Sequence, residues 1–218
     1  MKNFKKKQTN TSGWRFLPGL LVLVGMAFPQ AGQSRVAPEN ANEARANELW
    51  PPAMIMDIVG VSAGMTVAEI GAGRGRNVVH LADRVGPHGQ VYAEDIDAEA
   101  LRHLAERCRR VGFSNVVTVL GDVADPKLPP GALDSIVIIG SYQHFEDPVT
   151  LMRNARAALK KDGVVAIVDR FAAKDGPYDV SEETMKTQMK DAGFVFERLG
   201  KSLEAGQGSV YLFRLRSS

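Results

Sequence analysis

A run of glycines between an apolar segment and a helix-like segment is the strongest chemical signal in this chain. In the stretch VAEIGAGRGRNVVHLA, residues 67–82, Gly71, Gly73 and Gly75 occupy every second position, and Glu69 precedes them. Glycine lets the backbone turn at positive φ and lets a ligand approach the main chain closely. A helix that follows would point free N–H groups and the positive end of its dipole at the same place. The spacing therefore predicts a site for a carboxylate or a phosphate.

The acid and the glycine spacing discriminate between possible ligands. The dinucleotide-binding pattern G-x-G-x-x-G would need glycine at the position of Arg76. Glu69 would repel a pyrophosphate, whereas it would attract the ammonium and sulfonium groups of S-adenosylmethionine. We therefore expect Gly71, Gly73 and Gly75 to hold the methionine part of S-adenosylmethionine, with Glu69 close to its cationic groups.

Two further acids follow the next two predicted strands. The second strand ends in AEDID, and Asp95, preferred over Glu94 by its place after the strand, is expected to accept hydrogen bonds from the ribose hydroxyls. Asp122 in GDV is expected to accept from the adenine amine, and the Val123 N–H to donate to the ring. A lone glycine cluster is often a tight turn, and strand-end aspartates often cap helices. Signals at the ends of three successive strands are harder to obtain by chance, so together they favour an adenosyl ligand.

These residues need strands that end at one edge of a sheet. Continuous apolar or β-branched runs predict strands at residues 66–70, 89–96, 115–122, 133–141 and 164–171, with two more within 194–216. Helical patterns alternate with them at residues 75–85, 98–112, 147–163 and 181–193, and two short helices precede the first strand. This alternation predicts an α/β fold with a mostly parallel sheet covered on both faces. The last two strands have no helix between them, so they are expected to form an antiparallel hairpin at the edge.

The motifs resemble those of the class I S-adenosylmethionine-dependent methyltransferases. The resemblance runs from Trp50 to Leu215 and includes VAEIGAGRGRNVVHLA, VYAEDID, GDV, LDSIVIIGSYQHFEDP and LKKDGVVAIVDRF. It implies a Rossmann-like, doubly wound seven-stranded sheet and methyl transfer to a small-molecule acceptor. The segments on either side resemble a subgroup of small bacterial exported or membrane-linked methyltransferases, in which two histidines follow the fourth strand. Here the first of them is Gln143, which makes a non-catalytic adenosyl-binding module an alternative. An NAD-binding oxidoreductase is a separate alternative.

The residues after the fourth strand are the candidates for chemistry. Ser141, Tyr142 and His144 are expected to face the transferred methyl group, and His144 is the candidate base. Packing of YQHF against the end of the sheet is the alternative. Asp169 could orient His144 or an acceptor, with a turn role as its alternative, and Trp50 could cover the cofactor or simply pack.

Other charged and metal-binding residue types carry no functional signal. The histidines His80, His88 and His103 lack metal-ligand spacing, so no metal site is expected. The arginines of the helix at 98–112 (Arg102, Arg107, Arg109, Arg110) are predicted to form a solvated face. The single cysteine, Cys108, cannot form an internal disulfide and is expected to pack as a small apolar side chain.

The N-terminal residues differ in composition from the rest. Residues 1–34 contain five basic residues and no acid. Within this segment the basic start is followed by an apolar run and then by small residues, an order that predicts a signal peptide or membrane leader. Residues 35–49 are expected to be a linker or N-terminal arm, and residues 50–218 the methyltransferase domain. An exported, periplasmic or membrane-associated protein, attached through residues 1–31, is expected, with a cytoplasmic protein as the alternative. Beyond residue 34 the chain has 22 basic and 25 acidic residues, a balance that argues against a nucleic-acid partner.

Overall fold

The computed structural model describes residues 36–176, 179–203 and 208–216. The predicted leader at 1–34 therefore lies outside the described residues. The strands are β1 (Thr66–Ile70), β2 (Gln90–Asp95), β3 (Val116–Leu120), β4 (Leu133–Ile139), β5 (Leu159–Asp169), β6 (Phe194–Ser202) and β7 (Ser209–Leu215). The helices are α1 (Ala41–Leu49), α2 (Pro52–Val59), α3 (Val78–Val85), α4 (Ala98–Val111), α5 (Pro148–Ala155) and α6 (Glu182–Asp191), with short 3-10 turns η1 (Tyr142–His144) and η2 (Arg156–Ala158). None of these described helices is long and apolar enough to cross a bilayer.

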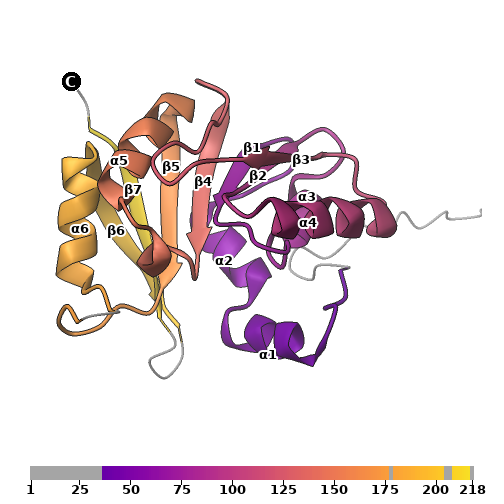
Figure 1. Cartoon of the computed structure of the whole chain (residues 1–218), viewed down its shortest axis with the longest axis horizontal. Helices are drawn as coiled ribbons and strands as arrows, with labels where there is room; N and C mark the ends of the chain where they lie inside the picture. The colour runs from indigo at the N-terminus through magenta and orange to yellow at the C-terminus, as the bar shows by residue number, and fades with distance from the viewer. Residues whose placement is uncertain (1–35, 177–178, 204–207, 217–218) are drawn as a thin grey trace, which may run out of the picture. The chain divides into compact units, whose positions relative to one another are not determined.

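The strands form one seven-stranded sheet in the order β3-β2-β1-β4-β5-β7-β6 (Figure 1). Strands β1 to β5 pair in parallel, and β7 runs antiparallel to both β5 and β6. The chain passes from β1 through β2 to β3 in one direction, and β4 then pairs on the other side of β1. The order thus reverses between β1 and β4, which is where open parallel sheets bind ligands. The predicted fold class is confirmed.

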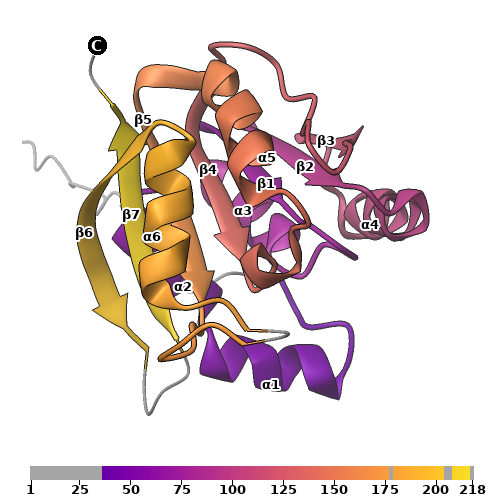
Figure 2. The same cartoon turned by 60° about the vertical axis from the view of Figure 1, so that its left-hand side comes forward.

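Helices cover both faces of the sheet (Figures 1 and 2). Along β4 the side chains alternate: Val137 and Ile139 pack with α2, α3 and α4, whereas Ile136 and Ile138 pack with α5 and α6. This period of two follows from strand geometry, because successive side chains point to opposite faces. The continuous apolar composition of the strands is therefore explained by burial on both sides.

The predicted helix over residues 147–163 is wrong at its C-terminal end. The α-helical part ends at Ala155, and β5 begins at Leu159. Leu159 pairs with Leu133 of β4 and is buried, whereas Lys160 is exposed. The alanines and lysines of ARAALKK favour a helix locally, but burial of Leu159 against the neighbouring strand overrides that preference.

The predicted solvated arginine face of α4 is wrong at Arg107. Its side chain is 2% exposed, and its Nη2 lies 2.5 Å from Oε1 of Glu43, whose side chain is 8% exposed. Glu39 adds a second carboxylate 3.7 Å from Arg107 Nε and also pairs with Arg110. These ion pairs fix α1 and the residues before it against α4, so the N-terminal arm is packed onto the domain.

This buried pair should be important for stability. Replacing Glu43 by glutamine leaves the Arg107 guanidinium buried without its closest anion, and loss of one partner of a buried pair costs about 3 to 5 kcal/mol. We expect the Glu43→Gln variant to lose about 3 kcal/mol in urea unfolding at pH 7, since Glu39 compensates in part.

The matched control is Glu99→Gln on α4. Glu99 pairs with Arg102 on the protein surface, with side chains 76% and 65% exposed, and exposed pairs contribute at most about 1 kcal/mol. Equal effects of the two substitutions would contradict a structural role for the buried pair.

Candidate functional site

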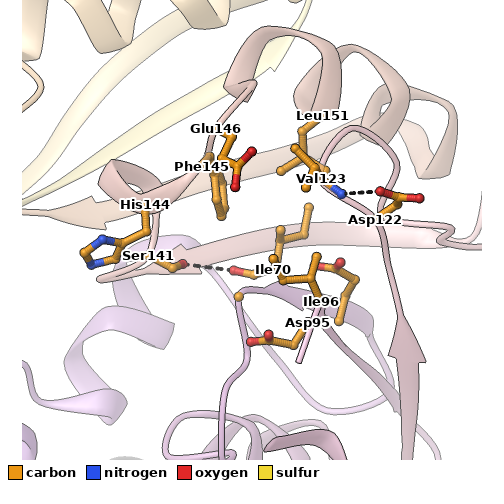
Figure 3. A pocket seen from close by; sticks show the side chains of 12 residues that line it. Ile70, Asp95, Ile96, Asp122, Val123, Ser141, His144, Phe145, Glu146 and Leu151 are labelled. Atoms are coloured by element: carbon orange, nitrogen blue, oxygen red, sulfur yellow. Dashed lines mark hydrogen bonds between the residues drawn. The ribbon is translucent and has the colours of Figure 1, made fainter. Parts of the chain in front are cut away.

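Two cavities open at the carboxyl ends of the parallel strands. The first has a volume of about 250 Å³ and is lined by residues from the ends of β1 and β2, from the loop after β3 and from the segment after β4 (Figure 3). The second, of about 470 Å³, is lined by Ala46, Leu49, Trp50, Arg76, Ile139, Gly140, Gln143, Asp169 and Arg170. The segment after β4 thus borders both cavities: Ser141, His144 and Phe145 line the first, and Ile139, Gly140 and Gln143 line the second.

The glycines after β1 have separate structural roles. A Cβ on Gly71 would lie 2.5 Å from the Ser141 Oγ, and one on Gly75 would lie 2.7 Å from the Leu104 Cγ. Both glycines also have positive φ, +76° and +88°. Gly71 therefore permits the end of β4 to cross close to the end of β1, where the Ser141 hydroxyl donates to the Ile70 carbonyl (3.1 Å).

Gly73 faces open space. A Cβ there would have no atom within 4 Å, and its φ is +52°. Its N–H donates to Asp95 Oδ2 (2.7 Å), and Asp95 Oδ1 accepts from the Asp97 N–H (2.9 Å). The glycine loop is thereby held beside the carboxylate that ends β2. The open face of this loop and the Asp95 side chain can contact one ligand together.

The first cavity also contains the pair expected to bind a nucleobase. Asp122 and Val123 both line it, but Asp122 Oδ1 accepts the Val123 N–H at 2.7 Å (Figure 3). The N–H expected to donate to an adenine ring is thus already hydrogen-bonded. A base that binds there must share or replace this hydrogen bond. The second carboxylate oxygen of Asp122 takes no part in it.

Two glutamates are buried at the same edge. Glu69 is 1% exposed; its Oε1 accepts from Asn77 Nδ2 (2.8 Å), and its Oε2 has no hydrogen-bond partner among the described residues. Burial raises the pKa of Glu69 to about 8, although the Asn77 hydrogen bond and the charge of Arg76 act in the opposite direction. Burial raises the pKa of Glu94, which lines the first cavity, to about 8 as well. The site can therefore hold protons that a cationic ligand would displace.

The second cavity combines an apolar wall with charged groups. Trp50 lies against Gly140, where a Cβ would be 2.7 Å from its Cζ3. Asp169 at the end of β5 is 5% exposed; its Oδ1 accepts from Gln143 Nε2 (3.0 Å) and from the Arg170 N–H (2.8 Å). Its Oδ2 has no partner within the described part of the chain. This cavity can bind a ligand that supplies a hydrogen-bond donor.

The two candidate catalytic side chains lie apart from the second cavity. His144 borders the first cavity and is exposed, and Figure 3 shows its imidazole directed away from the other labelled side chains. Tyr142 is buried among residues of α5 and α6, its hydroxyl donates to Gln188 Oε1 (3.1 Å), and burial raises the pKa of its phenol above the usual range. Tyr142 therefore packs in the core and lines neither cavity.

Several residues that line the cavities have no ligand role in the sequence patterns. Arg76 serves there only to exclude a dinucleotide pattern, and Gln143 only marks a departure from the histidine of similar sequences. Ile96 and Phe145, which line the first cavity, lie within the motifs VYAEDID and LDSIVIIGSYQHFEDP but have no ligand role there, and Leu151 of α5 lies outside the motifs. Only the positions of Ile96 and Phe145 shortly after β2 and β4 could have indicated them. Among the described residues, no group of three or more His, Cys, Asp or Glu side chains could hold a metal ion.

Comparison with known proteins gives a consistent result. A sequence-family profile described as a methyltransferase domain matches residues 61–204. Nocamycin O-methyltransferase of Saccharothrix syringae is 34% identical over 114 residues, which are 52% of this chain and 40% of the relative. Protein-L-isoaspartate O-methyltransferase of Ignicoccus hospitalis is 26% identical over 147 residues, 67% of this chain and 64% of the relative. The chain thus spans about half the length of the curated relatives it matches.

Solved structures share the fold. A protein described as a SAM-dependent methyltransferase from Aquifex aeolicus superposes with a TM-score of 0.70 at 22% identity, covering 81% of this chain and 97% of that one. At this level of identity the similarity shows the arrangement of helices and strands.

The raised pKa of Glu69 gives a testable pH dependence. Because this carboxyl has a usual pKa of 4.5 and a folded value of about 8, the folded protein holds a proton that the unfolded chain has lost between these pH values. The corresponding stability is fully present below pH 4.5 and is lost as the pH rises toward 8.

We expect the difference in free energy of unfolding between the wild type and Glu69→Gln to change by roughly 1.4 kcal/mol per pH unit within this window. Glutamine cannot ionise, and Glu94 is present in both proteins, so its contribution cancels. Urea unfolding of the ligand-free proteins at pH 5.5, 6.5 and 7.5 measures the difference. Parallel pH profiles would show that Glu69 ionises normally.

Proposed function

The chain belongs to the methyltransferase-domain family as a class I S-adenosylmethionine-dependent methyltransferase, and we propose that it methylates a small molecule that binds in the second cavity. The observation that carries this proposal is the cavity itself. Its volume of about 470 Å³ falls within the range of about 300 to 1,000 Å³ typical of small-molecule sites. It adjoins the glycine loop through Arg76 and has both an apolar wall and polar groups.

The residues at the strand ends fit S-adenosylmethionine. Asp95 offers a carboxylate beside the open face of the glycine loop, as a ribose diol requires. Asp122 and Val123 border the part of the first cavity that an adenine would occupy. The unpartnered Glu69 oxygen is a buried acceptor near the loop, suited to an ammonium group. When bound, S-adenosylmethionine supplies an electrophilic methyl group on a sulfonium sulfur.

The residues of the chain contribute mainly proximity and orientation. Ser141 is fixed by its hydrogen bond to Ile70 and forms part of the boundary between the two cavities. A ligand that extends from the first cavity across this boundary brings its sulfonium group to the border of the second. Holding two reactants at reacting distance is the largest contribution that such a site needs to make.

Asp169 and Gln143 are the proposed acceptor-binding groups. Gln143 Nε2 donates both to Asp169 Oδ1 and to the Arg170 carbonyl (2.9 Å), so it fixes the carboxylate at the end of β5. Asp169 can then accept a hydrogen bond from an O–H or N–H of the acceptor and take its proton. His144 is retained as the alternative base, because a rotation about its side-chain bonds would change which cavity it faces.

The second cavity is the argument for a small-molecule acceptor, because the two relatives are named for different substrates, a small molecule and a protein residue. The second cavity is bordered by α1 through Ala46, Leu49 and Trp50. A free small molecule fits a site walled in this way better than a residue within a folded protein or RNA does.

Residues 1 to about 31 are proposed to direct the chain to the membrane, and the folded domain to begin after them. A basic segment followed by an apolar run supports this division. The proposal conflicts with the cytosolic supply of S-adenosylmethionine. If the body is exported, it needs a source of ligand outside the cytosol.

Methyl transfer can be measured while the acceptor is still unidentified. The full chain is incubated with methyl-labelled S-adenosylmethionine and with separate small-molecule, protein and RNA fractions of a bacterial extract. We expect a labelled methylated product, separated from S-adenosylmethionine, in the small-molecule fraction. The Asp169→Asn variant should lose this product but keep its affinity for S-adenosylhomocysteine.

The Asp95→Ala variant tests the cofactor site, as Asp169→Asn tests the acceptor site. It should weaken S-adenosylhomocysteine binding by about 1 to 3 kcal/mol, because it removes hydrogen bonds to a buried ligand. Label in the protein or RNA fraction instead would overturn the small-molecule proposal. Ligand binding with no labelled product in any fraction would favour a non-catalytic adenosyl-binding module.

The leader is tested by fusing residues 1–40 to a reporter that is active only outside the cytosol. We expect an active reporter. A silent reporter, with the full-length protein in the cytosolic fraction, would contradict export and would remove the conflict over ligand supply.

A further inference from the structure

Arg76 is a half-buried cation with unused hydrogen-bonding capacity. It follows Gly75 directly, it lines the second cavity, and its Nη1 donates to Asn47 Oδ1 at 3.1 Å. A guanidinium has five N–H donors, and this is the one hydrogen bond that Arg76 makes to the described residues. No carboxylate of the described residues lies within ion-pair distance of it. Glu69 and Glu43 act on this guanidinium only electrostatically, so its free N–H donors can bind an anion in the cavity.

The acid that precedes the glycine loop is not that anion. Glu69, at the opposite end of the glycine loop, interacts with Arg76 electrostatically, but its Oε1 is bound by Asn77 and its Oε2 is without a partner among the described residues. The loop from Gly71 to Gly75 is therefore bounded by an acid and a cation that form no ion pair with the described residues. This arrangement is complementary to a zwitterion, with an ammonium toward Glu69 and a carboxylate toward Arg76.

We propose that Arg76 binds the α-carboxylate of S-adenosylmethionine and so fixes the amino-acid end of the ligand at the border of the second cavity. The inference rests on the methyltransferase function, and it assigns a role to a residue that the glycine motif does not include. Arginine suits this role because its planar fork binds a carboxylate through two parallel hydrogen bonds.

The same contact links the ligand to the N-terminal arm. Asn47, which accepts from Arg76, lies on α1, and its Nδ2 is 3.4 Å from His80 Nε2 on α3. Trp50, one residue after α1, lies against Gly140 at the end of β4. A carboxylate bound by Arg76 therefore lies beside α1, the helix that borders the acceptor cavity. Binding of the carboxylate helps to fix α1 in this position.

A ligand and a protein variant can be combined to test this assignment. The full chain and its Arg76→Gln variant are titrated calorimetrically with S-adenosylmethionine and with its decarboxylated form, which lacks only the carboxylate. Since a charge-assisted bidentate pair is lost, we expect the wild type to bind S-adenosylmethionine about 10- to 100-fold more tightly than the decarboxylated form. In Arg76→Gln this preference should fall to about 3-fold or less, because the group that recognises the carboxylate is gone.

Two variants serve as controls. Arg74→Gln, in the same loop, should keep the full preference, because Arg74 is exposed, contacts His103 and lines neither cavity. Arg76→Lys should keep part of it, since it retains the charge without the planar fork. Binding of 5′-methylthioadenosine, which lacks the whole amino-acid part, reports on the nucleoside site alone and should be unchanged in Arg76→Gln.

The outcomes separate this inference from the function on which it rests. An undiminished preference for the carboxylate in Arg76→Gln, or a wild type without any preference, would overturn the assignment while leaving the methyltransferase function intact. Equal weakening of all three ligands in Arg76→Gln would show general damage to the loop and would also overturn it. Failure of the wild type to bind any of the three ligands would contradict the proposed function itself.

Discussion

The close crossing of Gly71 and Ser141 is the constraint on which the ligand-binding edge depends. It occurs where strand order reverses between β1 and β4, the place where two neighbouring parallel strands send their following segments to opposite sides. Only a residue without a Cβ leaves room for the Ser141 side chain there. Because the segment after β4 passes so close to the glycine loop, it borders both cavities, and a ligand bound over the loop has its two ends in different surroundings.

The second feature of the site is unpaired polarity at a buried edge. Glu69 and Asp169 each have one carboxylate oxygen without a hydrogen-bond partner among the described residues, and Arg76 has no anion at ion-pair distance there. Buried polar groups without partners cost free energy in the absence of a ligand. By contrast, Arg107 and Glu43 form a buried ion pair with each other. The ion pair fixes the N-terminal arm to the domain, whereas the unpaired groups are available to bind a ligand.

Much of this arrangement could be predicted from sequence, because strand ends and glycines have strong local signals. Asp95, Asp122, Val123 and Ser141 do line the first cavity, since each ends an apolar strand or lies shortly after one. Arg107 lies on the buried face of α4 with Leu104 and Cys108, but its ion pair could not be predicted, because its partner Glu43 is 64 residues away. The direction of Tyr142 could not be predicted either: in a 3-10 turn after a strand, neither a period of two nor one of 3.6 applies. The role of Arg76 depends on a cavity wall built by α1, which no local pattern reveals.

The central claim is that the nucleoside occupies the first cavity and that the amino-acid end reaches the second across the Gly71–Ser141 crossing. A crystal structure with S-adenosylhomocysteine bound tests this most directly. The account predicts the ribose on Asp95, the adenine beside Asp122, and the sulfur at the crossing with the α-carboxylate at Arg76. An adenine in the second cavity, or a ribose without contact to Asp95, would contradict it.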